Sequence, residues 1–211
     1  FAVMVIGACS GVGVIRGIIA SAPTIDDIVA TPTGFLSTVL DANGNQTATL
    51  VASGSNRRAV TIDEIPKNLR HAFVAIEDER FYEHNGIDVT GIIRAGVKGV
   101  ASGFHFSEGA STITQQLLKN TVFTSWTSES SMADKFERKF QEQYLALQLE
   151  KVVDKDWILE NYLNAINLGQ NTLGVGVASE RYFGKDVSDL TLSECAVLAA
   201  ITQNPSKYNP I

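Results

Sequence analysis

The sequence is poor in the residues that most often build metal centres and disulfides. It contains two cysteines and three histidines among 211 residues. Cys9 and Cys195 lie far apart and show no C-x-x-C spacing, so they predict neither a metal site nor a disulfide. His71, His84 and His105 form no HExxH or other zinc-binding pattern. The sequence therefore predicts no zinc centre.

Basic residues are also fewer than acidic ones. Lysine and arginine number 17 against 23 aspartates and glutamates, which gives a formal net charge of -6 and a pI of about 5.1. A nucleic-acid-binding domain usually presents a basic surface, so we expect no nucleic-acid partner. Hydrophobic residues make up 45% of the chain, enough for a sizeable core. The length suits one domain of ordinary size plus a tail.

Long apolar runs are absent except in residues 1–22. Arg16 leaves about 15 uninterrupted residues before it, whereas a bilayer span needs about 20. Because the chain does not begin with Met, we expect an excerpt of a longer protein. We therefore interpret residues 1–22 as a truncated transmembrane signal-anchor helix, with a buried core helix as the alternative.

Residues 23–60 predict a linker with a short β-hairpin. The stretch "VLDANGNQTATLVASG" indicates strands at residues 37–41 and 46–52 around an Asn-Gly turn. From residue 61 onward the hydrophobic pattern is helical, so we expect a mainly α fold, with one domain over residues 61–211 that is truncated at its C-terminal end.

Capping signals divide this domain into helices. Thr61 and Asp63 are candidate N-caps of a first helix that would run to the stop signal Asn85-Gly86. A helix over residues 132–152 would carry an apolar stripe. That stripe consists of Phe136, Phe140, Leu147 and Val152. Further helices are expected after Asp88, after Gly109, after Asp156 and after Thr191, which forms a capping box with Glu194.

Three consecutive acids in "FVAIEDERFYEHNGID" are the first candidate for chemistry. On a helix, Glu77 would have Phe73 and Phe81 as neighbours one turn away. A carboxylate among apolar side chains has a raised pKa, which suits proton transfer. Asp78 would have Val74, Phe81 and Tyr82 as neighbours, so spacing does not separate the two acids, and a solvated acidic helix end is the alternative for both. Glu79 is expected to be solvated.

The second candidate is the polar face of "EGASTITQQLLKN". Thr112, Gln116, Lys119 and Asn120 recur at helical spacing, with Ser111 just before them. Hydroxyls, amides and a lysine on one face are typical of a surface that contacts sugar or phosphate, and a plain solvent face is the alternative. Third, Arg138 and Lys139 lie one turn from Glu142, where they could form a surface ion pair or hold a pyrophosphate or its metal ion.

Five motifs in order carry a resemblance to a known family. They are "EDERFYEHNGID", "EGASTITQQLLKN", "RKFQE", "ILENYLNAINLGQ" and "LTLSECAVLAAITQNPSKYNP". Together they resemble the peptidoglycan glycosyltransferase domain of class A penicillin-binding proteins and of monofunctional transglycosylases. The resemblance implies a lysozyme-like domain at the bacterial cytoplasmic membrane, with its catalytic part on the extracellular or periplasmic face. It also implies that the domain polymerises lipid II into β-1,4-linked glycan strands.

The resemblance further implies residue roles. Glu77 would be the general base and Glu142 the second catalytic carboxylate, near the donor's pyrophosphate. The remaining motif positions would bind substrate: Asp78, Phe81, His84, Ser111, Thr112, Gln116, Lys119, Asn120, Arg138, Lys139 and Lys155. No cofactor is obligatory, although a divalent cation, Mg or Mn, could bind at Glu142. Lipid II, the growing glycan chain, the lipid bilayer, other cell-wall synthesis proteins and a transpeptidase domain beyond this chain would be partners.

Two positions depart from the family pattern. Gly176 stands where an acid is expected, and Asn167 stands where an aromatic residue is common. Two other functions stay open on the sequence alone, a lysozyme-like lytic hydrolase and a non-catalytic lipid II-binding module. Aromatic residues near 104–106 and 121–127 could enter a bilayer or pack as ordinary loops.

Overall fold

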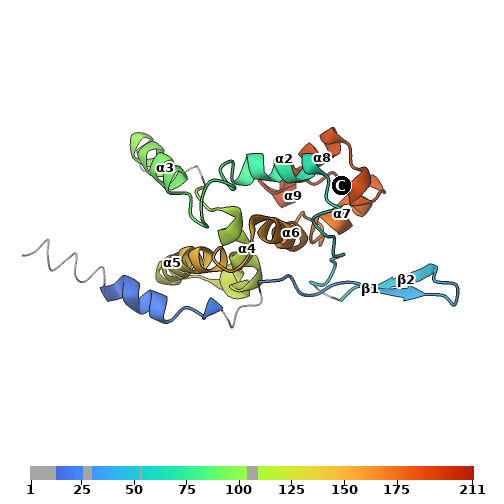
Figure 1. The fold of residues 1–211 in the computed structure, drawn as a ribbon, viewed down its shortest axis with the longest axis horizontal. Coiled ribbons are helices and arrows are strands. Elements are labelled where there is room, and N and C mark those ends of the chain that lie inside the picture. The colour runs from blue at the N-terminus through green and yellow to red at the C-terminus, as the bar shows by residue number, and fades with distance from the viewer. Residues whose placement is uncertain (1–12, 26–29, 53, 104–108) are drawn as a thin grey trace, which may run out of the picture.

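The computed structural model describes residues 13–25, 30–52, 54–103 and 109–211 (Figure 1). Most of this part of the chain is helical, which confirms the mainly α class, whereas the lysozyme-like arrangement stays a prediction. The elements are β1 Ser37–Leu40, β2 Gln46–Leu50, α2 Lys67–Glu77, α3 Val89–Ala101, α4 Ile113–Thr121, η2 Thr124–Ser128, α5 Met132–Leu149, α6 Lys155–Ala165, α7 Val175–Phe183, η3 Val187–Asp189, α8 Leu192–Ile201 and α9 Pro205–Tyr208.

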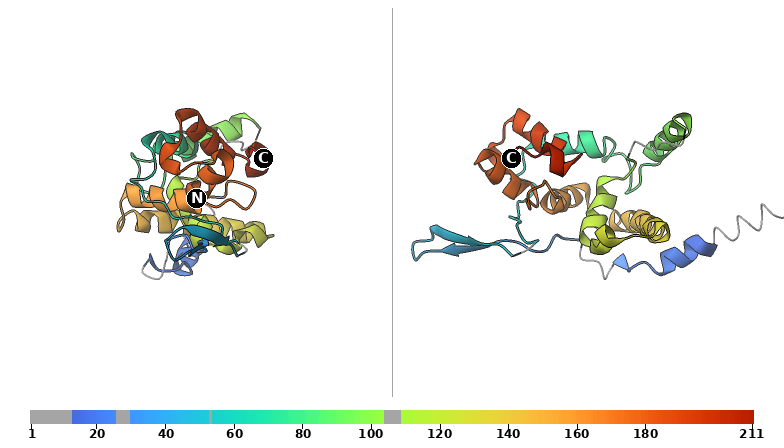
Figure 2. Two further views of the ribbon diagram at one scale, coloured as in Figure 1. Left: turned by 90° about the vertical axis from the view of Figure 1, so that its right-hand side faces the viewer. Right: turned by 180° about the vertical axis from the view of Figure 1, so that it is seen from behind.

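The core forms where helices distant in sequence pack together. Helix α4 packs against both α5 and α6, and α2 packs against α8 (Figures 1 and 2). Ile113, Leu117 and Leu118 of α4 are fully buried, as the apolar side of its pattern predicts. Phe73 of α2 meets Tyr162 of α6 edge to face, with ring centroids 6.3 Å apart. Helix α4 therefore lies at the centre of the packed helices, and its polar side chains remain available to form a site.

The predicted hairpin is confirmed, and it stands apart from the helices. Strands β1 and β2 pair antiparallel, with Ser37 opposite Leu50, and every residue of both strands is exposed. The views agree that the hairpin extends away from the helical body (Figures 1 and 2). Two strands without a covering layer are only marginally stable in water, so the hairpin adds little to the core.

The first predicted helix is wrong at both ends. The Thr61 backbone N–H and hydroxyl both donate to the Glu64 carboxylate, but the helix begins only at Lys67. Pro66 explains the delay, since a proline disfavours helical geometry in the residue before it. Helix α2 ends at Glu77, because Asp78 leaves helical geometry with φ -159° and its carboxylate accepts a hydrogen bond from the Ile113 N–H at 3.0 Å. The following turns bury Phe81 completely, which a continued helix would not achieve in the same way.

Helix α5 was predicted with the wrong face toward the core. Phe136 is 59% exposed and Val152, beyond the helix, is 63% exposed. The buried face instead contains Gln141, Glu142, Leu145, Ala146 and Leu149. The apolar stripe failed as a guide because two polar residues, Gln141 and Glu142, take core positions for their hydrogen bonds.

Caps elsewhere agree with the sequence in part. Asp88 accepts from the Gly91 N–H at the start of α3, and Thr191 and Glu194 form the complete capping box of α8. Helix α6 begins one residue before its predicted cap: Asp154, not Asp156, accepts from the Trp157 N–H at 2.8 Å. Asp156 lies inside the first turn, where an acid suits the helix dipole.

Helix α3 projects from the rest of the fold. It lies apart from the other helices in Figure 1 and in the right-hand view of Figure 2. Its apolar residues face outward: Val89, Ile92, Ile93, Val97 and Val100 are 38–65% exposed.

A helix over residues 13–20 lies at the same end of the molecule, beside α5, to which Ser21 and Gln141 bind it. Among the described residues no helix is both long and apolar enough to cross a membrane. Residues 1–12 of the predicted anchor, which covers residues 1–22, lie outside the described residues, so the anchor stays a prediction.

Candidate active site

Glu77 lies at the last position of α2, where three side chains from distant elements meet it. Gln116 of α4 donates its Nε2–H to Glu77 Oε2 at 2.8 Å. On the other oxygen, Glu77 Oε1 accepts from the Thr202 hydroxyl and from Gln203 Nε2 at 3.1 Å. These partners are amide and hydroxyl donors, which hold the orientation of the carboxylate and which helical spacing did not predict.

Tyr162 connects this carboxylate to the core. It is fully buried, and its hydroxyl donates to Gln116 Oε1 at 3.4 Å. Burial, together with the charges of Glu77 and Asp78, raises the pKa of Tyr162 well above its usual value. The phenol therefore stays protonated and orients Gln116 so that the amide N–H points at Glu77.

Asp78 and His84 form a second polar network behind Glu77. The His84 Nε2 atom lies 2.9 and 3.0 Å from the two oxygens of Asp78, and the two side chains are 9% and 2% exposed. His84 Nδ1 accepts from the Gly86 N–H at 3.2 Å, while the Gly86 carbonyl accepts from the Thr112 hydroxyl at 2.7 Å. Asp78, His84 and Thr112 thus join the turns after α2 to the start of α4. In the free protein they support the site from behind, since Thr112 is only 1% exposed.

A cluster of cations lies on the α5 side of Gln116. Arg138 contacts the buried Glu142 through Nη1, and its Nε donates to both oxygens of Glu129 at 2.9 and 3.0 Å. Lys139 Nζ lies 2.9 Å from the other Glu142 oxygen and donates to the Ser111 hydroxyl at 2.6 Å. Burial works against ionisation of Arg138, but Glu129 and Glu142 outweigh it and raise the pKa of its guanidinium.

Lys119 completes this cluster in a different way. Its Nζ lies 3.7 Å from the centroid of the Trp126 ring, a cation–π contact. Burial lowers the pKa of Lys119, and the charge of Glu142 works in the opposite direction. We define the cation cluster as Lys119, Arg138 and Lys139. Three cations against two carboxylates leave the cluster net positive.

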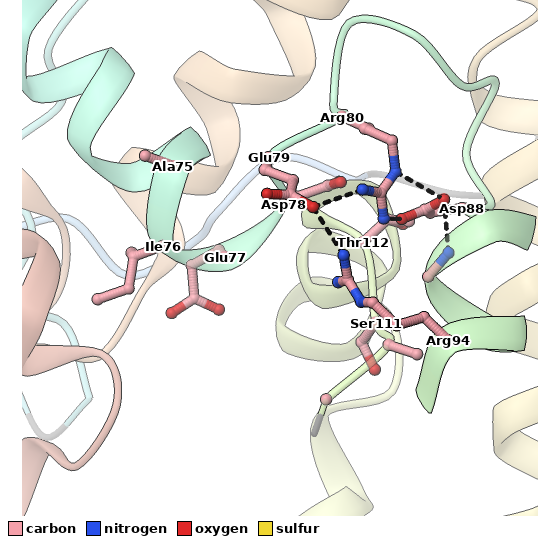
Figure 3. Close-up of a pocket in the computed structure, with 13 residues that line it drawn as sticks. Ala75, Ile76, Glu77, Asp78, Glu79, Arg80, Asp88, Arg94, Ser111 and Thr112 are labelled. Carbon is pink, nitrogen blue, oxygen red and sulfur yellow. Dashed lines mark hydrogen bonds and ion pairs between the residues drawn. The ribbon is translucent and has the colours of Figure 1, made fainter. Parts of the chain in front are cut away.

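Two cavities share Ser111, and Glu77 lines the first of them. One, of about 150 Å³, lies between the end of α2 and the start of α3, and Figure 3 shows Glu77 outside the ion pairs that cross it. Those pairs join Arg80 to Asp88 and Glu79 to Arg94, the latter at 2.7 Å. Glu79 is exposed, as expected, and both arginines contact it and lower its pKa.

The other cavity, of about 320 Å³, lies between α4 and α5. Nine predicted site residues line one cavity or the other: Glu77, Asp78, Ser111, Thr112, Gln116, Lys119, Arg138, Lys139 and Glu142. The structure therefore brings a hydrogen-bonded carboxylate, amides, hydroxyls and a net positive cluster around one continuous region.

Four predicted substrate-binding residues line neither cavity: Phe81, His84, Asn120 and Lys155. The ammonium group of Lys155 lies 2.6 Å from the nearly buried Glu150 and 4.4 Å from the Phe81 ring centroid, so the lysine and Phe81 belong to the packing behind α4. Asn120 lines a separate cavity beside Thr31 and Arg57.

Sequence reasoning missed several residues that contact the site. Thr202 and Gln203 reach Glu77 from the end of α8, although both stand in the quoted fifth motif. Gln115 accepts from Lys139 at 3.4 Å, and Trp126 and Glu129 contact the cation cluster. Trp126 and Glu129 do not belong to a recognisable sequence pattern, so only their contacts in the structure identify them as part of the site.

The suggested divalent cation does not fit Glu142. Both of its oxygens already contact cations, Arg138 and Lys139, and its side chain is 1% exposed. Across the residues that the structure describes, no group of three or more His, Cys, Asp or Glu could hold a metal ion. The residues present therefore give a metal no protein-built site here.

Gly176, where an acid was expected, is explained by packing. A Cβ at this position would lie 2.7 Å from the Arg58 carbonyl oxygen and 3.0 Å from Val60 Cγ1. A larger side chain cannot be accommodated without moving the backbone. Asn167 also has a local role, because its side chain accepts from the Gly169 N–H at 2.9 Å and its backbone bridges Leu173.

Comparison with known proteins assigns the class. A family model described as "Transglycosylase" matches residues 43–211, and the chain belongs to this transglycosylase family, as its motifs predicted. The chain is 46% identical over 208 residues, 97% of its length, to "Penicillin-binding protein 1A" of Clostridium perfringens (strain 13 / Type A), where it spans 30% of that protein.

It is also 47% identical over 176 residues, 83% of its length, to "Penicillin-binding protein 1F" of Bacillus subtilis (strain 168), where it spans 23%. The chain thus spans less than a third of the length of these relatives.

Proposed function

We propose that this chain is a peptidoglycan glycosyltransferase that polymerises lipid II into β-1,4-linked glycan strands, with Glu77 as general base. The observation that carries the proposal is the juxtaposition of a fixed carboxylate with a net positive cluster. Gln116 contacts Glu77 on one side and lines the cavity of Lys119, Arg138 and Lys139 on the other. Membership of the transglycosylase family supports the same reaction class.

The chemistry follows from these two parts. The acceptor's sugar hydroxyl attacks the anomeric carbon of the donor and forms the new C–O bond, while the bond to the donor's diphosphate breaks with inversion. Glu77 takes the hydroxyl proton, and the diphosphate leaves with the bonding electron pair. Oriented cations stabilise that developing charge better than water can, because they need no reorganisation. Glu142 acts here as a positioning residue, since it holds Arg138 and Lys139 side by side.

The test is lipid II polymerisation by a Glu77→Gln variant. Glutamine keeps the size and most hydrogen bonds but cannot accept the proton, so the rate should fall by about 10²–10⁴-fold with an unchanged unfolding temperature. Glu79→Gln is the matched control, because it removes a carboxylate two residues away that is already paired with Arg94. Glycan synthesis at the wild-type rate by Glu77→Gln would refute Glu77 as the base.

Two other functions make different predictions. A lysozyme-like hydrolase would release muropeptides from purified cell wall without using lipid II, yet hydrolysis of glycan has no need of a cluster such as Lys119, Arg138 and Lys139. A non-catalytic module would bind lipid II without turnover. The positive cluster beside Glu77 favours the transferase over the hydrolase, and turnover separates the transferase from the binding module.

The bilayer is the proposed second partner. The outward apolar residues of α3 and the helix at residues 13–20 lie at one end of the molecule, opposite the hairpin. A surface of this kind suits contact with lipid, where a polyprenyl-linked substrate resides. This supports a place at the bacterial cytoplasmic membrane, with the catalytic part on the extracellular or periplasmic face. Other cell-wall synthesis proteins and a transpeptidase domain stay expectations.

A further inference from the structure

One short segment contacts two of the three cations in the cluster. Trp126 lies in η2, and Glu129 follows η2 directly. The Trp126 ring lies over the Lys119 ammonium at 3.7 Å, and Glu129 binds Arg138 through both carboxylate oxygens. We call residues 126–129 the cover. It is separate from the helices that build the cluster, because Lys119 belongs to α4 and Arg138 to α5.

Glu129 and Glu142 hold Arg138 in different ways. Glu142 is buried on α5 itself, one turn after Arg138, so its contact is part of the helix packing. Glu129 comes from the cover, and its side chain is 14% exposed. Both Glu129 oxygens accept from the same Arg138 Nε–H, and a phosphate oxygen can accept from that N–H in their place. Of the two acids, Glu129 is the one whose place a diphosphate could take without disrupting a helix.

Electrostatics make that exchange favourable for an anionic substrate. With Glu129 in place, Arg138 lies between two carboxylates and attracts a further anion only weakly. Lys119 is held over an aromatic ring in partly buried surroundings, and burial lowers its pKa. A diphosphate offers both cations more negative charge than a carboxylate and a ring face do.

We infer that Glu129 and Trp126 set the affinity of this site for the diphosphate of the substrate. In the free protein Glu129 occupies the position on Arg138 that a diphosphate oxygen takes, and Trp126 holds Lys119 until that oxygen arrives. Binding then exchanges both contacts and frees the cover from the cluster. The inference rests on the proposed function, because it takes the donor's diphosphate as the ligand. Glu129 and Trp126 thereby select doubly charged ligands, which can displace them, over neutral sugars, which cannot.

The first experiment measures inorganic pyrophosphate binding by calorimetry in the full chain. Glu129→Gln removes the competing charge and keeps the side-chain shape, so pyrophosphate should bind about fivefold tighter, the size expected for loss of a partly exposed ion pair. Asp134→Asn is the matched control: it removes one negative charge from an exposed position of α5, and affinity should change less than about twofold because salt screens that charge. Unchanged or weaker binding by Glu129→Gln would overturn the inference and make Glu129 a support for Arg138.

The second experiment follows Trp126 directly. Trp157 is the other tryptophan of the chain, so a Trp157→Phe background leaves Trp126 as the sole indole reporter. Pyrophosphate should change Trp126 emission and increase its quenching by acrylamide, with a midpoint about fivefold lower when Glu129→Gln is added. Emission that stays constant while calorimetry shows saturation would rule out the role of Trp126.

Lipid II assays on the same samples separate this inference from the proposed function. If the wild-type chain polymerises lipid II but shows none of the pyrophosphate effects, the transferase stands and the role of the cover is refuted. If the pyrophosphate effects appear but lipid II is not polymerised, the cover is supported as a regulator of an anion site and the transferase is refuted.

Discussion

At the scale of single residues, charge alone does not identify a substrate contact. Lys155 and Lys139 are both lysines of recognised motifs, yet their surroundings differ. Lys155 faces Glu150, which is 4% exposed and also accepts from the Thr114 hydroxyl, whereas Lys139 is 38% exposed and lines the cavity between α4 and α5. The first arrangement is typical of a structural ion pair and the second of a group available to a ligand.

This difference gives a prediction with an internal control. Lys155→Met should lower the free energy of unfolding by about 3 kcal/mol, because Glu150 is left as a buried charge without its cation. Pyrophosphate affinity should stay within about twofold of wild type. Lys139→Met should do the reverse, weakening pyrophosphate binding with a smaller loss of stability. Urea unfolding and calorimetry measure the two effects. A Lys155→Met chain that unfolds normally but binds pyrophosphate poorly would restore Lys155 as a substrate contact.

Gly86 is a second residue whose role depends on its surroundings. Its φ is +92°, and an added Cβ would lie 2.6 Å from the Ala146 carbonyl oxygen. Gly86→Ala should therefore destabilise the protein by about 3 kcal/mol, from the left-handed backbone and the overlap together.

Gly184 tests the backbone part alone. It has φ +68° at the end of α7, but no atom lies within 4 Å of the position that a Cβ would take there. Gly184→Ala should cost only about 1 kcal/mol. Urea unfolding of both variants checks the comparison, and equal losses would show that the Ala146 contact gives way freely.

At the scale of elements, local signals located the caps of α3 and α8 but not those of α2 and α6. Thr191, Glu194 and Asp88 cap as their residue types predict, since a cap depends on hydrogen bonds within one turn. The end of α2 could not be read in this way. It is fixed by the Ile113 N–H, 35 residues further on, from which Asp78 accepts a hydrogen bond. The core face of α5 was misjudged for the same reason, because Glu142 is buried by Arg138 and Lys139 and not by hydrophobicity.

The capping box of α8 predicts a pH-dependent stability. Hydrogen bonds from the Thr191 backbone, the Lys185 ammonium and the Thr191 hydroxyl lower the pKa of Glu194 to about 2. A carboxylate with a folded pKa below its unfolded value, near 4.3, contributes stability above that unfolded value and loses it as the pH falls toward 2. Glu194→Gln should therefore lower the melting temperature at neutral pH, and the difference from wild type should shrink between about pH 4 and pH 2.

Glu180→Gln, at an exposed position of α7, controls for the loss of one charge. It should show no comparable effect on the melting temperature across this range. A Glu194→Gln difference that grows at low pH would contradict the sign of the argument.

At the scale of the whole molecule, the sequence predicted the family better than it predicted the arrangement of the site. Five ordered motifs identified the family and named Glu77, Gln116, Arg138 and Lys139, which the fold places around adjoining cavities. Helical spacing could not show that Thr202 reaches Glu77 across 125 residues of chain. Contacts of this kind depend on how α2 and α8 pack, which no local pattern records.

The outward face of α3 is the feature that relates the whole molecule to its surroundings. Ile93 and Val97 are 62% and 65% exposed on a helix that projects from the core. Replacing both with glutamine removes apolar area without adding charge, and should weaken binding to phosphatidylcholine vesicles by about tenfold or more, since each buried side chain contributes about 1.5 kcal/mol.

Leu192→Gln is the control, because Leu192 is equally exposed, at 65%, at the start of α8. Vesicle co-sedimentation measures both. If α3 meets the bilayer, only the α3 variant loses binding while its lipid-free pyrophosphate affinity is kept, because the cation cluster lies on α4 and α5. Equal losses in the two variants would instead indicate nonspecific hydrophobic adsorption and leave α3 without a special role at the membrane.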